Sequence, residues 1–194
     1  MKVAAINLLP QNGELFLLPN FIGEQEAADF YNKLEKEIDW QLYHIKIFGK
    51  LLAQPRLSAW YGNVSYTYSG IRLEPKPFSP LIEEIKQKIE LATGHTFNSV
   101  LLNLYRDGND SMGWHSDDEK ELGINPVIAS LSVGANRLFK VKHKQQKGLG
   151  LNLNLGQGSL LVMGGEMQHS WQHAIPKSSK ACLPRINLTF RKIY

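Results

Sequence analysis

A histidine and an aspartate stand two positions apart in the segment His115-Ser116-Asp117. In an extended segment, side chains two residues apart point to the same face, so this imidazole and carboxylate can bind one metal ion. A third ligand has to come from elsewhere, and the stretch 167–173 offers His169 and His173. Two histidines and one carboxylate form a facial triad, which leaves the open positions that iron(II) needs for a co-substrate and dioxygen.

The spacing alone leaves two questions open. His169 and His173 are four residues apart and share the parity of a strand, so periodicity does not choose between them. The same ligand types also bind zinc. His-X-Asp is moreover a frequent sequence, and a histidine or aspartate in a loop is ordinarily just solvated.

A second set of polar residues alternates with apolar ones near the C-terminus. In a strand, one face would carry Arg185, Asn187, Thr189 and Arg191, and the other Ile186, Leu188 and Phe190. The guanidinium fork of arginine matches a carboxylate, so this face would suit a dicarboxylate such as 2-oxoglutarate and favours iron over zinc. An outer strand with solvated arginines is the alternative.

A further polar pair, Asn103 and Tyr105, shares one face just upstream of the metal motif. Both side chains are suited to bind a ligand through hydrogen bonds. Either one is equally explained as a hydrogen-bonded polar group of the core.

The overall composition indicates the class of protein that carries these residues. The 194 residues are 43% hydrophobic and 21% charged, which fits one globular domain. The net charge of +4 favours polyanionic partners only mildly.

Cys182 is the single cysteine, so an internal disulfide is excluded and a reducing compartment is expected. No apolar run has the length of a membrane helix. We expect an intracellular protein without membrane contact, cytoplasmic in a bacterium or nuclear in a eukaryote, and by default a monomer.

Apolar periodicity predicts the elements that position these residues. Helices are expected at 24–38 and 80–93, the second with Ser79 as N-cap, Pro80 in its first turn and Gly94 at its end. Strands are expected at 101–105, 128–133, 138–141, 151–155, 159–163 and 185–191. Two early helices and many short strands predict an α+β, mostly β fold in which helices pack on a β-sandwich or jelly roll.

Taken in order, these segments resemble the AlkB family of nucleic-acid dealkylating oxygenases. The resemblance runs from about residue 55 to the C-terminus, and its most specific part is arginine-X-asparagine-X-threonine-X-arginine at 185–191. The other matching motifs are Asn103-X-Tyr105-X-X-Gly108, Trp114 through Glu119, 128–134, 158–163 and Trp171-Gln172-His173. The resemblance implies one Fe(II)/2-oxoglutarate dioxygenase domain over 1–194, a double-stranded β-helix with N-terminal helices. A nucleotide-recognition lid would span about 40–75 and the catalytic jelly-roll core about 100–194.

The resemblance also implies a role for each matching residue. It makes His115, Asp117 and His173 the iron ligands, choosing His173 because the family's distal histidine follows an aromatic residue by two positions. Fe(II), 2-oxoglutarate and O2 are the expected cofactor, co-substrate and oxidant. The implied 2-oxoglutarate contacts are Asn103, Tyr105, Arg185, Asn187 and Arg191.

The implied substrate is alkylated DNA, with RNA as the alternative. A base flipped out of the duplex would be held between Tyr68 and His115, with Tyr66 and Glu119 near its polar edge. The full implied set of substrate contacts is Arg56, Tyr66, Tyr68, Ser69, Glu119 and, as a wedge between two lysines, Phe48. The expected reaction is oxidative dealkylation of bases such as 1-methyladenine and 3-methylcytosine, which releases formaldehyde and succinate. The alternatives are an oxygenase acting on RNA or a protein side chain, and a non-catalytic nucleic-acid-binding module.

Overall fold

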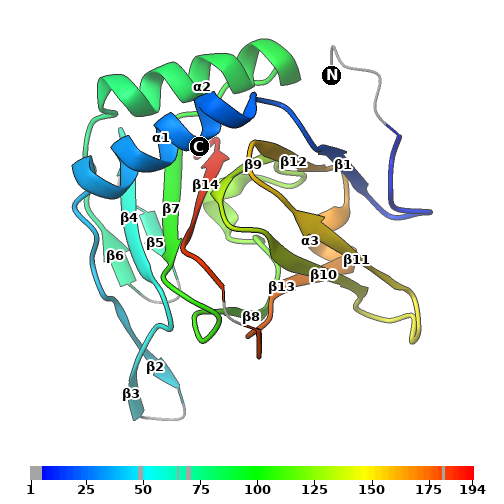
Figure 1. Cartoon of the computed structure of the whole chain (residues 1–194). Helices are drawn as coiled ribbons and strands as arrows, with labels where there is room; N and C mark the ends of the chain where they lie inside the picture. The colour runs from blue at the N-terminus through cyan, green and yellow to red at the C-terminus, as the bar shows by residue number, and fades with distance from the viewer. Residues whose placement is uncertain (1–5, 48–49, 65, 69–70, 181) are drawn as a thin grey trace.

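The computed structural model describes residues 6–47, 50–64, 66–68, 71–180 and 182–194. Two helices, α1 (Glu24–Glu37) and α2 (Pro80–Thr93), lie side by side over one face of a six-stranded sheet (Figure 1). A four-stranded sheet lies on the other side of the larger sheet, so the strands form two layers (Figure 1). This arrangement confirms the predicted α+β, mostly β class and the jelly roll.

Every strand pair in the two sheets is antiparallel. The six-stranded major sheet has the order β1 (Glu14–Leu18), β12 (Ser159–Gly164), β9 (Ile128–Gly134), β14 (Arg185–Arg191), β7 (Ser99–Tyr105) and β4 (Leu57–Gly62). The four-stranded minor sheet has the order β11 (Gly150–Leu155), β10 (Arg137–His143), β13 (Trp171–Ile175) and β8 (Met112–His115). Two short hairpins stand apart: β2 (His44–Ile47) with β3 (Lys50–Ala53), and β5 (Tyr66–Tyr68) with β6 (Ile71–Leu73).

The caps of α2 form as the sequence predicts. The Ser79 hydroxyl accepts a hydrogen bond from the Ile82 amide at 3.3 Å, which satisfies one of the free N–H groups of the first turn. The helix ends at Gly94, whose φ of 76° lies in the left-handed region that glycine adopts without a steric penalty. The first helix ends one residue before the predicted Ile38.

The two faces of the major sheet have different packing partners. One face packs against α1 and α2 through a buried apolar cluster that includes Ile89, Leu188 and Phe190. The other face and the minor sheet enclose a second apolar cluster that includes Phe139, Leu161 and Trp171. Burying apolar surface on both faces fixes the two sheets and the helices as three layers.

The six predicted strands all form, but the prediction omits others. Strands β8 and β13 carry metal-motif histidines, and their sequences, MGWH and WQHAI, do not alternate between polar and apolar residues. The resemblance assigns residues 57–62 to the lid, whereas they form β4, an edge strand of the major sheet that pairs with β7. Among the described residues, no helix is long and apolar enough to cross a membrane.

The buried face of α2 gives a direct test of this packing. Ile89 is fully buried and Leu91, two residues along the same helix, is 71% exposed. We expect Ile89→Ala to lower the free energy of unfolding by about 2–5 kcal/mol, because it leaves a cavity between helix and sheet. Leu91→Ala should change it by about 0.5 kcal/mol or less. Urea denaturation of both variants measures the difference, and equal losses would contradict the packing described.

Candidate active site

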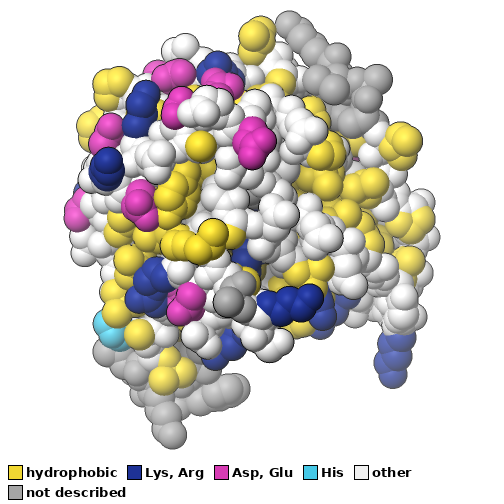
Figure 2. Space-filling model, in the orientation of Figure 1, with side chains coloured by type: hydrophobic (Ala, Val, Ile, Leu, Met, Phe, Trp, Pro, Cys, Tyr) yellow, Lys and Arg dark blue, Asp and Glu magenta, His cyan; other side chains and the backbone are white. Residues whose placement is uncertain are grey.

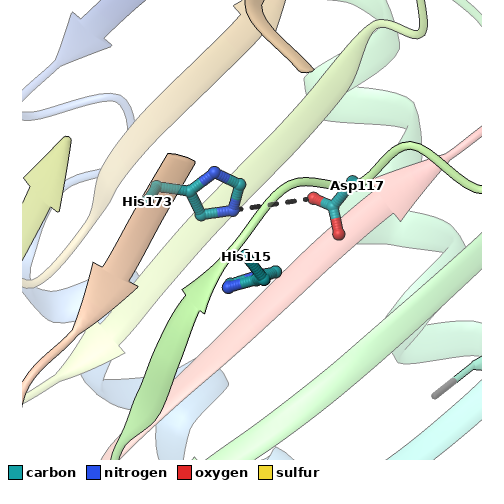
Figure 3. A group of neighbouring side chains, drawn as sticks. All are labelled: His115, Asp117 and His173. Carbon is teal, nitrogen blue, oxygen red and sulfur yellow. Dashed lines mark ion pairs between the residues drawn. The ribbon is translucent and has the colours of Figure 1, made fainter. Parts of the chain in front are cut away.

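Three side chains from two neighbouring segments meet between the sheets. The potential ligand atoms of His115, Asp117 and His173 all lie within 4.8 Å of one another. His173 Nε2 is 3.8 Å from Asp117 Oδ2, and the two imidazole centroids are 4.2 Å apart (Figure 3). Asp117 and His173 are buried, while His115 is partly exposed. Among the residues that the structure describes, this is the group suited to hold a metal ion.

The strand pairing brings the two histidines together. His115 ends β8 and His173 lies directly opposite it on β13. The Nδ1–H of His115 donates to the Gly113 carbonyl at 2.9 Å, which leaves Nε2 with its lone pair for a metal. Asp117 lies beyond the end of β8, so the convergence of its carboxylate with His115 does not rest on strand parity as predicted.

His169, the other candidate, lies away from this group. It belongs to a short helix, α3 (Met167–Ser170), its ring is exposed, and its Nε2 contacts the carbonyl of Ile124. The chain changes from helix to strand at Trp171, so the parity shared by His169 and His173 has no structural meaning. The geometry therefore favours His173.

Charges around the triad set its protonation. Burial alone would raise the pKa of the Asp117 carboxyl, but the Arg191 guanidinium and the two imidazoles lower it to about 2. Arg191 Nη2 donates to Asp117 Oδ1 at 2.8 Å. Burial lowers the pKa of His173 to about 3, and the neighbouring His115 acts in the same direction. At neutral pH the group therefore offers a carboxylate and a neutral imidazole, the forms that bind a metal.

The register of β14 collects the predicted co-substrate residues in one place. Arg185 pairs with Tyr105 of β7, and Asn187 pairs with Asn103. Because paired residues of neighbouring strands point to the same face, all four side chains line the pocket that also contains the triad. Arg185 is 1% exposed and Arg191 is 3% exposed, so the alternative of an outer strand with solvated arginines is wrong.

The guanidinium of Arg185 is only partly satisfied by the protein. Its Nη2 donates to the Ser132 hydroxyl at 2.8 Å, while Nε and Nη1 are buried without a hydrogen-bond partner among the described residues. Burial lowers the pKa of Arg185 to about 10, which leaves it charged at neutral pH. A buried cation with two unused donors is costly unless an anion binds there. The pocket therefore fits a carboxylate ligand beside a metal.

Comparisons with known proteins agree with this donor set. The model of the 2OG-Fe(II) oxygenase superfamily matches residues 14–191. The chain belongs to this superfamily, in its AlkB-type branch. It is 42% identical over 202 residues to the human alpha-ketoglutarate-dependent dioxygenase alkB homolog 3, covering 99% of this chain and 71% of that protein.

Three further relatives and one solved structure extend the comparison. Identity is 42% over 183 residues to human DNA oxidative demethylase ALKBH2, with 88% of this chain and 70% of that protein covered. For the Arabidopsis thaliana ALKBH2 it is 34% over 213 residues, with 95% and 68% covered. The chain spans only 65% of the bovine alkB homolog 3. The solved structure of OsALKBH1 has a TM-score of 0.63 at 17% identity, covering 92% of this chain and 96% of that one, and supports the fold.

In this AlkB-type oxygenase, Arg56 lies behind the pocket. It is 4% exposed, and its Nε donates to Asn103 Oδ1 at 2.9 Å. The Ser58 hydroxyl donates to the same oxygen at 2.8 Å. Both contacts use Oδ1, so the Nδ2 group of Asn103 is the part of the amide that can donate to a ligand. The contacts of Arg56 are therefore with the pocket wall, and its predicted contact with substrate stays a prediction.

Arg137 is a buried cation beside Tyr105, a residue of the pocket wall, and sequence reasoning does not identify it. It is 3% exposed, and its guanidinium donates to the carbonyls of Asp107, Asp110 and Pro176 at 2.7–2.9 Å. It also lies 5.4 Å from the ring centroid of Tyr105, which has Arg185 at 5.3 Å. It comes directly before the strand expected at 138–141, a place where an arginine is ordinarily a surface cation. No local pattern in the sequence marks it, because its partners are backbone carbonyls of other segments.

The predicted substrate residues are described to different extents. Glu119 is partly buried and lies two residues after Asp117, at the start of a 3-10 turn (Lys120–Leu122). Phe48 and Ser69 lie outside the described residues. Of Tyr66 and Tyr68 only the backbone, in β5, is described.

The lowered pKa of His173 predicts how the metal-free AlkB-type protein responds to acid. Below pH 6.5 the unfolded chain takes up a proton on this imidazole, whereas the folded chain does so only near pH 3. Stability should therefore fall with decreasing pH in this window, by about 1.4 kcal/mol per pH unit from this group.

Urea denaturation of the chelator-treated protein and of His173→Gln isolates that contribution. The comparison is made above pH 3.8, the ordinary pKa of an aspartate carboxyl. The stabilising effect of the ionised Asp117 carboxylate is lost only as the pH falls from there toward 2. The variant should have the flatter pH profile. Parallel profiles would show that His173 is protonated equally in both states.

Proposed function

We propose that this AlkB-type oxygenase removes alkyl groups from the ring nitrogens of bases in DNA. The observation that carries the proposal is the His115, Asp117, His173 group beside a buried guanidinium with unused donors. The relatives named alkB homolog 3 and DNA oxidative demethylase ALKBH2, each about 42% identical, support DNA as the substrate.

The triad would hold Fe(II), and the β14 face would hold 2-oxoglutarate. When bound, these groups and dioxygen supply the oxidation: the N-linked alkyl carbon gains one oxygen atom, and 2-oxoglutarate becomes succinate and carbon dioxide. The hydroxylated alkyl group then leaves as an aldehyde, and the base recovers its ring nitrogen. The protein's part is to hold the reactants together and keep water out.

Each residue of the pocket has a defined task in this scheme. Arg185 would pair with the distal carboxylate through Nε and Nη1, and Tyr105 beside it would complete that end of the site. Asn103 would donate through Nδ2, with Asn187 lining the same wall. Arg191 is hydrogen-bonded to Asp117, so it would keep the metal-binding carboxylate ionised and oriented.

The substrate end of the site would be formed by Glu119 and the lid. A carboxylate near the base edge suits a lesion that carries positive charge, as alkylated ring nitrogens do. On the lower part of the face drawn in Figure 2, Lys and Arg side chains outnumber acidic ones, whereas both signs of charge alternate over the helices. A surface with an excess of basic side chains would attract a polyanion. The protein would act as a monomer, in the compartment that holds the DNA.

A direct assay supplies iron(II), 2-oxoglutarate and an oligonucleotide bearing 1-methyladenine or 3-methylcytosine. Formaldehyde, succinate and restored base should form in equal amounts. Single-stranded DNA, duplex DNA, RNA and a histone-like peptide are compared side by side. Turnover on the RNA or the peptide alone would replace the proposed substrate, and failure of the protein to bind iron(II) would leave a non-catalytic module.

The two ligand histidine candidates make a matched pair of variants. His173→Ala should reduce turnover to background, as should His115→Ala and Asp117→Ala, because each removes a metal ligand. His169→Ala removes an exposed imidazole outside the triad and should retain activity. Circular dichroism verifies that each variant is folded. Loss of activity in His169→Ala alone would reverse the ligand assignment.

A variant of Arg185 tests co-substrate binding separately from DNA binding. Arg185→Lys keeps the charge but loses the fork, and a hydrogen bond to a charged group contributes about 1.5–3 kcal/mol. The KM for 2-oxoglutarate should therefore rise roughly ten- to a hundredfold, with little change in the KM for DNA. Arg106→Lys is the control and should change neither, because the Arg106 side chain is half-exposed and pairs with Asp110. An equal rise in both KM values would show that Arg185 does not act specifically on 2-oxoglutarate.

A further inference from the structure

The metal-binding carboxylate lies where the strand ladder has ended. Strands β8 and β13 are paired at His115 with His173 and at Met112 with Ile175, with a shift in register between the two pairs. Asp117 comes two residues after the last residue of β8, which is also the free edge of the minor sheet. Sheet hydrogen bonds therefore do not hold the backbone of this ligand.

Two side-chain hydrogen bonds take the place of the ladder. The Asp117 amide donates to Gln168 Oε1 at 2.9 Å, and the Ser116 hydroxyl donates to the Trp171 carbonyl at 2.8 Å. Both acceptors belong to the segment that leads directly into His173, the third ligand. The two bonds thus join the segment with the first two ligands to the segment with the third.

The acceptors themselves are firmly held. Gln168 is 1% exposed, its Nε2 lies 3.7 Å from Met163 Sδ, and its carbonyl accepts from Lys144 Nζ at 2.9 Å. Trp171 is fully buried, and its indole N–H donates to the Asn12 carbonyl at 3.0 Å. Buried side chains with satisfied hydrogen bonds have little freedom to move, so both acceptors are fixed points.

The carboxylate and the backbone of Asp117 are thus held by different residues. Arg191 donates to Oδ1 and orients the carboxylate, while Gln168 accepts from the peptide N–H. Ser116 and Gln168 are placed to act on the metal only through Asp117 and its neighbours, which makes them positioning residues.

We propose that Ser116 and Gln168 pre-form the metal site by fixing the Asp117 segment against the segment that carries His173. This inference rests on the proposed assignment of the three metal ligands. Without the two bonds, the segment after β8 would have to be ordered when the metal binds, and that ordering would weaken metal affinity. Residues that support metal ligands in this way commonly change metal affinity by 10–100-fold.

Metal affinity is measured by isothermal titration calorimetry with Mn(II), a probe that does not oxidise during the experiment. Gln168→Met keeps the length of the side chain but removes the acceptor, and Ser116→Ala removes one oxygen atom. We expect the Kd for Mn(II) to rise about tenfold or more in Gln168→Met and severalfold in Ser116→Ala. Ser116→Thr retains the hydroxyl and should remain near the wild-type Kd.

A second readout distinguishes positioning from a merely structural role. In a positioning role, the Tm of the metal-free variants stays close to wild type, and the rise in Tm caused by Mn(II) becomes smaller. In a structural role, the metal-free Tm falls and the Kd is unchanged. At saturating metal, the KM for 2-oxoglutarate should not change, because neither residue is among those assigned to the co-substrate.

Two results would overturn the proposal. The first is a Kd for Mn(II) within twofold of wild type in both Gln168→Met and Ser116→Ala, each shown to be folded. If Gln168→Met does not fold, the Kd of Ser116→Ala decides alone. The second is equal binding of Mn(II) by wild type and Asp117→Ala, which would overturn the ligand assignment as well. Tight binding by wild type, none by Asp117→Ala and intermediate binding by the two variants supports both.

Discussion

The two guanidinium groups of β14 are buried in the middle of the major sheet, where each charge has to be matched by polar groups. Arg191 is matched by Asp117, and Arg185 only partly by Ser132. Because β14 is paired on both sides, its neighbours in register supply further polar groups to the pocket: Asn103 and Tyr105 from β7, and Ser130 from β9. The donor set of the pocket is therefore a product of strand register.

Local patterns predict this part of the molecule well. Alternation along 185–191 separates the polar face from the apolar one, and the structure places the first in the pocket and the second against the helices. The caps of α2 follow from Ser79 and Gly94. The fold class could likewise be predicted, because a jelly roll needs many short strands with turns between them, and that is a property of sequence order.

The parts that could not be predicted depend on contacts between distant residues. Arg56 and Asn103 are 47 positions apart, and only the pairing of β4 with β7 brings them together. The choice between His169 and His173 depends on the change from helix to strand at Trp171, which strand parity cannot detect and which only the family resemblance anticipates. Arg137 and Gln168 have no distinguishing local pattern, because their partners are backbone groups of other segments.

The central place of β14 has a consequence for the order of assembly during synthesis. The strand lies between β7 and β9, although both are translated long before it. Until residues 185–191 have emerged from the ribosome, β7 and β9 each have one unpaired edge that faces the space the last strand will occupy. The sheet therefore closes last at its own centre, and the anion pocket is completed in the same event. A nascent chain lacking this strand would expose two unpaired strand edges and would need protection from aggregation.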